Sequence, residues 1–297
     1  MKRIFRQVDV FTTVPYMGNP VAVVLDGAGL TTAQMQHFAH WTNLSETTFV
    51  LPPSAPGADY AVRIFTPTLE LPFAGHPTLG TCHAWLASGN TPARPDNIVQ
   101  ECAAGLINLR QTADGFAFAA PPLVRSGPVD EAEVQRLAEI LRIDRSKIVD
   151  AAWADNGPGW VAVMLDSVET LLAVKPAYSD YDIGLVATYD NGGASPNSLT
   201  ALPKVGAVAQ RTQGDIAIEV RAFFPKDGSV AEDPVTGSLN AALAQWLLGT
   251  GRLQSPYIAA QGSVLGRSGR IHVNQDAEGI IWIGGGTVTC IEGRVEL

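Results

Sequence analysis

The stretch Pro77-Thr78-Leu79-Gly80-Thr81 decides the fold, because the chain repeats it 157 residues later as Pro234-Val235-Thr236-Gly237-Ser238. A neighbouring stretch, Arg63-Ile64-Phe65-Thr66-Pro67, returns as Arg221-Ala222-Phe223-Phe224-Pro225 after 158 residues. The two matches occur in the same order and at nearly the same offset. The chain therefore consists of two halves built on one plan.

The two halves differ in their polar residues. A third match, of residues 21–26 with residues 161–166, has an offset of 140 and leaves room for insertions in the second half. Under the offset of 157, His76 takes the place of Asp233, and Glu46 has no carboxylate counterpart. Unlike ionisable groups at one equivalent turn of a duplicated scaffold indicate an active site where the halves face each other.

Size and composition fit two globular domains. The chain has 297 residues, 46% of them hydrophobic and 16% charged, far from the composition of disordered proteins. The net charge of −9 and the lack of Lys/Arg runs argue against nucleic acids and anionic membrane surfaces as partners. No apolar run reaches the roughly 18 residues of a membrane span, and the first residues lack the apolar core of a signal peptide. We therefore expect a cytoplasmic protein.

The three cysteines, Cys82, Cys102 and Cys290, form an odd and sparse set without a C-x-x-C pair. This pattern favours reduced structural thiols. A catalytic Cys82 is the alternative, but this residue lies in an expected helix and need not face the same site as His76.

Two expected helices lack a polar face. Residues 78–87 and 236–248 are nearly apolar all round, which predicts that each is buried inside a curved sheet. Residues 30–42 and 130–141 instead have the pattern of surface helices. The expected strands are residues 4–11, 20–25, 47–51 and 60–65 in the first half, and 157–165, 183–188, 205–209, 216–224, 263–266, 269–273 and 279–288 in the second.

The segment Ala119-Ala120-Pro121-Pro122 is the expected domain boundary. It defines an N-terminal domain of residues 1–120, completed by residues 287–297, and a C-terminal domain of residues 121–286, with the active site in the cleft between them. The last strand contains Gly284-Gly285-Gly286. Because no helix follows and no lysine lies within it, backbone crowding or a bulge explains this run better than a nucleotide loop.

Each repeated turn places small residues directly before the N-terminus of a buried helix. The first amides of a helix and its partial positive charge attract anions, and Gly75 and Gly237 would let a ligand approach the backbone closely. We expect two such helix ends, facing each other, to hold a small carboxylate. The alternative is that these glycines and prolines only shape turns.

Glu46 lies in Asn43-Leu44-Ser45-Glu46-Thr47, between an expected helix and a strand. A general base at this position needs burial that raises its pKa from about 4.3 toward neutrality, and we expect Leu44, Phe49 and Trp41 to supply it. The alternative is a solvated loop residue. No metal-ligand set, dinucleotide fingerprint or Walker loop is found, so we expect neither a metal nor a cofactor.

Several longer motifs resemble those of the PhzF family, the phenazine-biosynthesis isomerase-like proteins. These motifs are Val8-Asp9-Val10-Phe11, Gly18-Asn19-Pro20-Val21-Ala22-Val23, Asn43-Leu44-Ser45-Glu46-Thr47, Arg63-Ile64-Phe65-Thr66-Pro67, Pro72-Phe73-Ala74-Gly75-His76-Pro77-Thr78-Leu79-Gly80 and Glu232-Asp233-Pro234-Val235-Thr236-Gly237-Ser238. They run in order through nearly the whole chain. The resemblance implies the diaminopimelate epimerase-like fold, an α+β architecture of two similar domains, each a curved, mostly antiparallel sheet around a central helix. It also implies a homodimer.

The resemblance further implies a reaction and a set of site residues. The family isomerises trans-2,3-dihydro-3-hydroxyanthranilate without a cofactor or metal: a glutamate takes a proton from C3 and returns it at another ring carbon, and the enol then becomes a ketone. The matching residues are Glu46, Asp233 and His76 as the catalytic set and Gly75, Gly237 and Ser238 as the substrate-binding set. We therefore expect a cofactor-independent isomerase of a small cyclic or amino-acid-like carboxylate.

Two alternatives stay open. One is an epimerase or racemase of a small amino or hydroxy acid, with Glu46 and either Asp233 or His76 as the acid/base pair. A racemase with two thiols is disfavoured, because Ala74 and Asp233 take the places that cysteines hold in epimerases of this fold. The other alternative is a protein that binds a small carboxylate without turnover.

Overall fold

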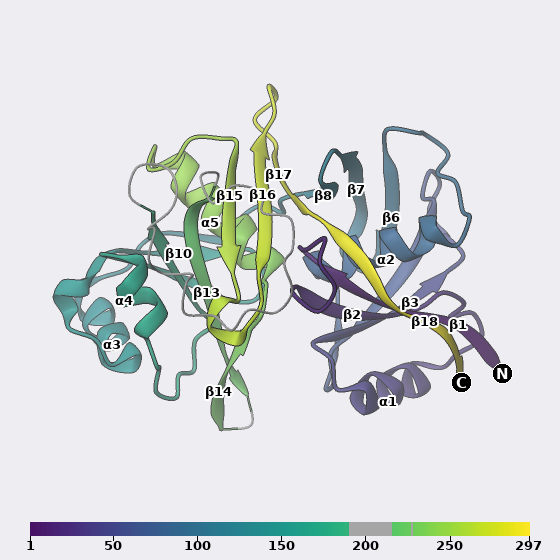
Figure 1. Ribbon diagram of the computed structural model, residues 1–297, viewed down its shortest axis with the longest axis horizontal. Coiled ribbons are helices and arrows are strands. Elements are labelled where there is room, and N and C mark those ends of the chain that lie inside the picture. The colour runs from purple at the N-terminus through teal and green to yellow at the C-terminus, as the bar shows by residue number, and fades with distance from the viewer. Residues whose placement is uncertain (190–215, 227) are drawn as a thin grey trace. The chain divides into compact units, whose positions relative to one another are not determined.

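The computed structural model describes residues 1–189, 216–226 and 228–297. The chain folds into two compact units, which are Met1–Ala119 with Trp282–Leu297, and Ala120–Ile281 (Figure 1). The strand expected at residues 205–209 lies outside the described residues. Among the described residues, no helix combines the length and the apolar character that crossing a membrane requires.

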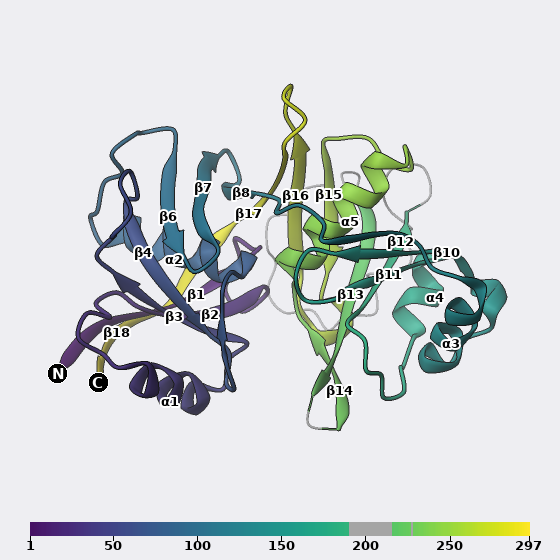
Figure 2. The same ribbon diagram turned by 180° about the vertical axis from the view of Figure 1, so that it is seen from behind.

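In the first unit, one mixed sheet surrounds the helix α2 (Gly75–Ala87), as Figure 2 shows. The short β5 (Glu70–Leu71) pairs with β4. The hydrogen-bonded order of the other strands is β18 (Thr287–Glu296), β1 (Lys2–Val10), β2 (Asn19–Val24), β3 (Glu46–Leu51), β4 (Tyr60–Phe65), β6 (Ile98–Cys102), β7 (Gly105–Thr112), β8 (Gly115–Ala119) and β17 (Ile281–Gly285).

The central helix α2 is buried on nearly all sides, as its apolar sequence predicts. Gly80 allows it to lie directly on the sheet, because a Cβ atom there would be 2.3 Å from Val21 Cγ1 and 3.0 Å from Val10 Cγ2. The helix starts three residues earlier than expected, at Gly75 rather than at residue 78. Its first turn therefore includes His76 and Pro77.

The outer helix α1 (Thr32–Thr42) covers the other face of β3 and β4. Thr31 and Gln34 form a capping box at its start, and Phe38 packs edge-on against Phe49 in the core. Trp41 is 74% exposed and only stacks on Phe38. The expectation that Trp41 buries Glu46 is therefore wrong, because the last turn of α1 points this side chain to solvent.

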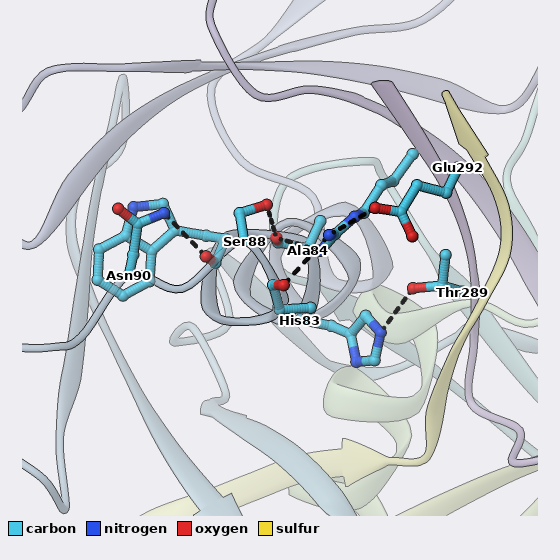
Figure 3. A network of polar contacts seen from close by, with 9 residues as sticks. His83, Ala84, Ser88, Asn90, Thr289 and Glu292 are labelled. Carbon is cyan, nitrogen blue, oxygen red and sulfur yellow. Dashed lines mark hydrogen bonds and ion pairs between the residues drawn. The ribbon is translucent and has the colours of Figure 1, made fainter. Parts of the chain in front are cut away.

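The strand β18 is held to α2 by polar contacts as well as by its pairing with β1. Both ring nitrogens of His83 lie 2.9 Å from threonine hydroxyls of β18, those of Thr287 and Thr289. Arg6 donates to the carbonyl oxygens of Ala84 and Ala87 at the end of α2, and to Glu292 of β18, at 3.0–3.1 Å (Figure 3). The end of the chain is thus an integral part of the first unit.

The second unit has the same plan. Its central helix is α5 (Gly237–Gly249), and α3 (Glu131–Leu141) and α4 (Val168–Ala173) pack on the outer face of the sheet. β14 (Ser229–Asp233) pairs with β13. The order of the other strands is β9 (Arg125–Pro128), β10 (Ile148–Asp155), β11 (Val161–Leu165), β12 (Ile183–Thr188), β13 (Ile216–Lys226), β15 (Tyr257–Gln261) and β16 (Gly269–Gln275).

The strand pairings show the duplication directly. In the first unit the parallel pair β2 and β3 flanks α1, and the parallel pair β4 and β6 flanks the central helix α2. In the second unit the parallel pair β11 and β12 flanks α4, and the parallel pair β13 and β15 flanks the central helix α5. The repeated arginines also make the same contact. Arg63 binds Glu70, and Arg221 binds Glu232, each through Nε and Nη2 to the two carboxylate oxygens.

The structure corrects the register of the repeat at the central turn. The central helices begin at Gly75 and Gly237, which are 162 residues apart, not 157. His76 therefore corresponds to Ser238, not to Asp233. In the same way Ala74, the N-cap of α2, corresponds to Thr236, the N-cap of α5, so the expected pairing of Ala74 with Asp233 is also wrong. The sequence match was misleading because Pro77 lies inside its helix, whereas Pro234 precedes its helix.

Glycines explain one confirmed prediction and one wrong prediction in the second half of the chain. Gly284 and Gly286 meet main-chain crowding as expected, because a Cβ atom at Gly284 would be 2.6 Å from Phe116 O. Residues 263–266 are not a strand. They form a 3₁₀ turn, Ser263–Leu265, because Gly262 and Gly266 on either side adopt φ values of 93° and 69° that end the strand.

Candidate active site

Glu46 and His76 are in contact in the first unit, although they are 30 residues apart in sequence. Glu46 is the first residue of β3, and His76 lies in the first turn of α2. The distance from Glu46 Oε2 to His76 Nε2 is 3.1 Å, with the two side chains 15% and 6% exposed. The structure thus brings together two of the predicted catalytic residues in a largely buried place.

The imidazole of His76 is neutral at physiological pH. Burial lowers its pKa from 6.5 to about 3, and a hydrogen bond with the main chain of Pro20 offsets only part of this effect. Asn19 Nδ2 lies 3.5 Å from the other ring nitrogen, Nδ1. The contact with Glu46 is therefore one between a carboxyl group and a neutral ring, so a proton can enter or leave Glu46 without breaking an ion pair.

The start of α2 adds main-chain donors beside this pair. Its N-cap, Ala74, has no side chain that can cap the helix, and the first intrahelical bond is from Thr78 N to Ala74 O. The amides of Gly75 and His76 precede this bond and so have no acceptor within the helix. They form the kind of positively polarised end that stabilises a carboxylate or an enolate oxygen.

The second unit presents a different set of groups at its equivalent turn. Asp233 ends β14, and its Oδ2 accepts a hydrogen bond of 2.6 Å from Thr236 Oγ1. Gly237 is the first residue of α5 and is buried. Ser238 Oγ accepts from Trp160 Nε1 at 3.1 Å, and Ser238 O accepts from Asn156 Nδ2 at 2.9 Å.

Asn19 and Trp160 are site residues that the sequence-based prediction does not include. Asn19 is the first residue of β2, and Trp160 directly precedes β11. Each brings a side-chain N–H group near the second residue of its central helix, His76 or Ser238. The sequence signal that could have found Trp160 is the third repeat, which has an offset of 140. Trp160 lies 141 residues after Asn19, so the two residues take nearly equivalent positions.

The predicted residues thus gather in two groups. Glu46, His76 and Gly75 lie together in the first unit, and Asp233, Gly237 and Ser238 lie together in the second. A cleft between the two halves stays a prediction.

Among the described residues, neither Cys82 nor any group of possible metal ligands indicates a second catalytic or metal site. Burial raises the pKa of the Cys82 thiol to about 12, so this residue is a core thiol rather than a nucleophile. In the part of the chain that the structure describes, no three His, Cys, Asp or Glu side chains gather as metal ligands do.

Comparison with known proteins places the chain in a family. The model of the family PhzC-PhzF, described as "Phenazine biosynthesis-like protein", matches residues 8–293. The chain belongs to the PhzF family. The trans-2,3-dihydro-3-hydroxyanthranilate isomerase of Pseudomonas aeruginosa is 32% identical to it over 303 residues, which cover 98% of each chain. "Antisense-enhancing sequence 1" of Schizosaccharomyces pombe is also 32% identical, over 98% of this chain and 97% of that one.

A solved structure agrees with this assignment. The PhzF-family phenazine biosynthesis protein of Bacillus anthracis superposes with a TM-score of 0.78 over the whole of both chains, at 23% identity. The fold class predicted from the sequence, two similar α+β domains of the PhzF type, is therefore confirmed. The protein is an isomerase, as its relative from Pseudomonas aeruginosa is by name.

Proposed function

We propose that this PhzF-family isomerase moves a proton between two carbons of a small cyclic or amino-acid-like carboxylate, with Glu46 as the general acid/base. The observation that carries the proposal is the 3.1 Å contact between the largely buried carboxyl group of Glu46 and the neutral imidazole of His76. The first substrate to test is trans-2,3-dihydro-3-hydroxyanthranilate, on which the relative from Pseudomonas aeruginosa acts by its name.

The chemistry needs one base that becomes an acid. The carboxylate of Glu46 removes the proton from C3 of the ring, and the electron pair moves through the diene toward another ring carbon. The same carboxyl group then returns the proton there, and the enol formed tautomerises to a ketone. Because His76 is neutral, it supports both protonation states of Glu46 without an ion pair.

The remaining predicted residues have binding roles in this proposal. The amides at Gly75 and His76 stabilise negative charge that develops on the substrate. Asp233 and Ser238 of the second unit bind its polar groups. A general acid/base contributes typically about 10²–10⁴ to the rate. Glu46 is therefore the residue whose loss should matter most.

The test is an ultraviolet time course with trans-2,3-dihydro-3-hydroxyanthranilate in deuterated buffer. We expect turnover by the unaltered protein, deuterium in the product, and a rate lower by about 10²-fold or more in Glu46→Gln. The control Glu278→Gln makes the same chemical change in an exposed turn and should keep the full rate.

Three other results would each change the proposal. A fully active Glu46→Gln protein would exclude Glu46 as the base. Loss of optical rotation without a spectral change would favour the epimerase. No change at all with the unaltered protein would exclude this dihydroanthranilate as the substrate.

A further inference from the structure

Gln261 contacts the turn before α5 with both ends of its amide. This residue ends β15 and is fully buried. Its Oε1 accepts hydrogen bonds from Thr236 N at 3.0 Å and from Asn240 Nδ2 at 2.9 Å. Its Nε2 donates to Asp233 O at 3.1 Å and to Thr236 Oγ1 at 3.0 Å. Oε1 thus accepts two hydrogen bonds and Nε2 donates two, all to residues of the turn or of the start of α5.

The orientation of this amide is determined by main-chain groups. A backbone N–H can only donate and a backbone C=O can only accept, so Oε1 must face Thr236 N and Nε2 must face Asp233 O. A flipped amide would place two donors together and two acceptors together. Nε2 is therefore a donor toward Thr236 Oγ1.

The direction of the hydrogen bond from Gln261 bears on the next hydrogen bond, which joins Thr236 to the carboxylate of Asp233. Thr236 Oγ1 receives a proton from Gln261, so its own single hydrogen is available for the 2.6 Å bond to Asp233 Oδ2. In this arrangement Asp233 Oδ2 is the acceptor of the bond.

We propose that Gln261 is a positioning residue, which acts through Thr236 to hold Asp233 Oδ2 as a hydrogen-bond acceptor. This inference rests on the proposed function, in which Asp233 binds the substrate. The substrate group at Asp233 is then a hydrogen-bond donor, a hydroxyl or an amino group, and its carboxylate binds elsewhere. Asp233 also does not deliver a proton from Oδ2, as the alternative of an epimerase with Asp233 as the acid requires.

The first unit has a similar glutamine but not the same chain of bonds. Gln100 at β6 is also fully buried, accepts from Tyr60 OH at 3.2 Å, and donates to Thr78 Oγ1 at 2.9 Å. The N-cap of α2 is Ala74, which has no hydroxyl group to pass a bond on. The relay to a carboxylate is thus a special property of the second turn.

The kinetic test compares Gln261→Glu with Gln261→Leu. The carboxylate introduced by Gln261→Glu can only accept. In the alkaline range where this buried group is ionised, the hydroxyl of Thr236 would turn away from Asp233, and kcat/KM should fall about 10- to 100-fold. In acid the new carboxyl group is protonated and donates one hydrogen bond again. The ratio of Gln261→Glu to unaltered protein should therefore rise as the pH falls, whereas Gln261→Leu should stay impaired at every pH.

The control for this test is Gln245→Glu, because Gln245 lies on α5 and donates to Pro121 O and Ala241 O, away from the turn. It should keep its activity at all pH values. Among the described residues that hydrogen-bond to the Gln261 side chain, only Asp233 has an ionisable side chain. Dividing the activity of the variant by that of the unaltered protein removes pH effects that the two proteins share. A ratio for Gln261→Glu that does not change with pH would overturn the positioning role.

A second measurement does not depend on activity. In a neutron structure of the deuterated protein we expect deuterium on Thr236 Oγ1, directed at Asp233 Oδ2. Deuterium on Oδ2, directed at Thr236, would overturn the inference even in an active enzyme. If the dihydroanthranilate assay shows no turnover, the proposed function fails, and the neutron map still decides the role of Gln261.

Discussion

The neutral imidazole of His76 links the active site to the stability of the first unit. The pKa of His76 is about 3 in the folded protein, below its ordinary value of 6.5, because the ring is buried. Between these two pH values the unfolded chain binds a proton that the folded chain does not. The contribution of His76 to stability is therefore complete above pH 6.5 and is lost progressively as the pH falls toward 3.

Replacing His76 with asparagine should remove this pH dependence. Both proteins should lose free energy of unfolding when the pH falls from about 7 to about 5. The loss should be about 2 kcal/mol smaller in His76→Asn than in the unaltered protein. Urea unfolding at the two pH values measures this difference. Equal losses in His76→Asn and the unaltered protein would show that the ring is protonated in the folded state.

The individual residues of the site could be predicted better than their arrangement. Glu46 and His76 stand out in the sequence, but their contact depends on the parallel pairing of β2 with β3 and on the start of α2 at Gly75. Trp160 has no chemical signature of its own. Its role follows from its position beside Ser238, which only the fold determines.

At the level of elements, the two equivalent arginine–glutamate ion pairs differ in burial and therefore in their expected effect on stability. The Arg63 and Glu70 side chains are 27% and 33% exposed, whereas those of Arg221 and Glu232 are 5% and 10% exposed. Arg221 also donates through Nη1 to carbonyl oxygens at the end of α4, those of Leu171 and Val174. It therefore joins the hairpin β13–β14 to α4.

Breaking the buried pair should cost much more stability than breaking its exposed twin. Arg221→Met leaves the charge of Glu232 buried without its partner and should destabilise the protein by about 3–5 kcal/mol. Arg63→Met, the matched control, should cost about 0–1 kcal/mol. Urea unfolding of both variants tests this difference. The double variant Arg221→Met/Glu232→Gln should recover part of the loss, and similar losses in the two single variants would contradict the argument.

The secondary structure could be predicted where the hydrophobic period is strong and not where glycine controls the backbone. The two central helices and β4 are close to their expected ranges. The expected strands do not include β5, β6, β7, β8, β9, β10, β14 and β15. Of these, β5 and β9 have too few residues to show an alternation. At residues 263–266 an apolar pattern indicated a strand, but the left-handed φ values of Gly262 and Gly266 produce a turn.

At the scale of the whole molecule, the end of the chain completes the unit that contains the start of the chain. β18 pairs with β1 along the whole of β1, from Lys2↔Glu296 to Val10↔Thr287. It also holds the side chains of His83 and Arg6 through Thr289 and Glu292 (Figure 3). In the second unit, β9 takes the same place beside β10, but it precedes that unit's other strands in sequence. The first unit is thus the one that needs a distant segment.

A rearranged chain should therefore fold as the first unit alone. Residues 282–297, a short Gly/Ser linker and residues 1–119 form one continuous chain, and a short linker suffices because Met1 N and Leu297 O are 2.6 Å apart. We expect this protein to show near-ultraviolet circular dichroism and cooperative urea unfolding, because β1 and α2 recover β18. Residues 1–119 alone, or with residues 282–297 in scrambled order, should show neither, since they leave the edge of β1 and one side of α2 open to water. If residues 1–119 alone unfold with the same midpoint as the linked chain, β18 is an accessory strand and not a part of the folding unit.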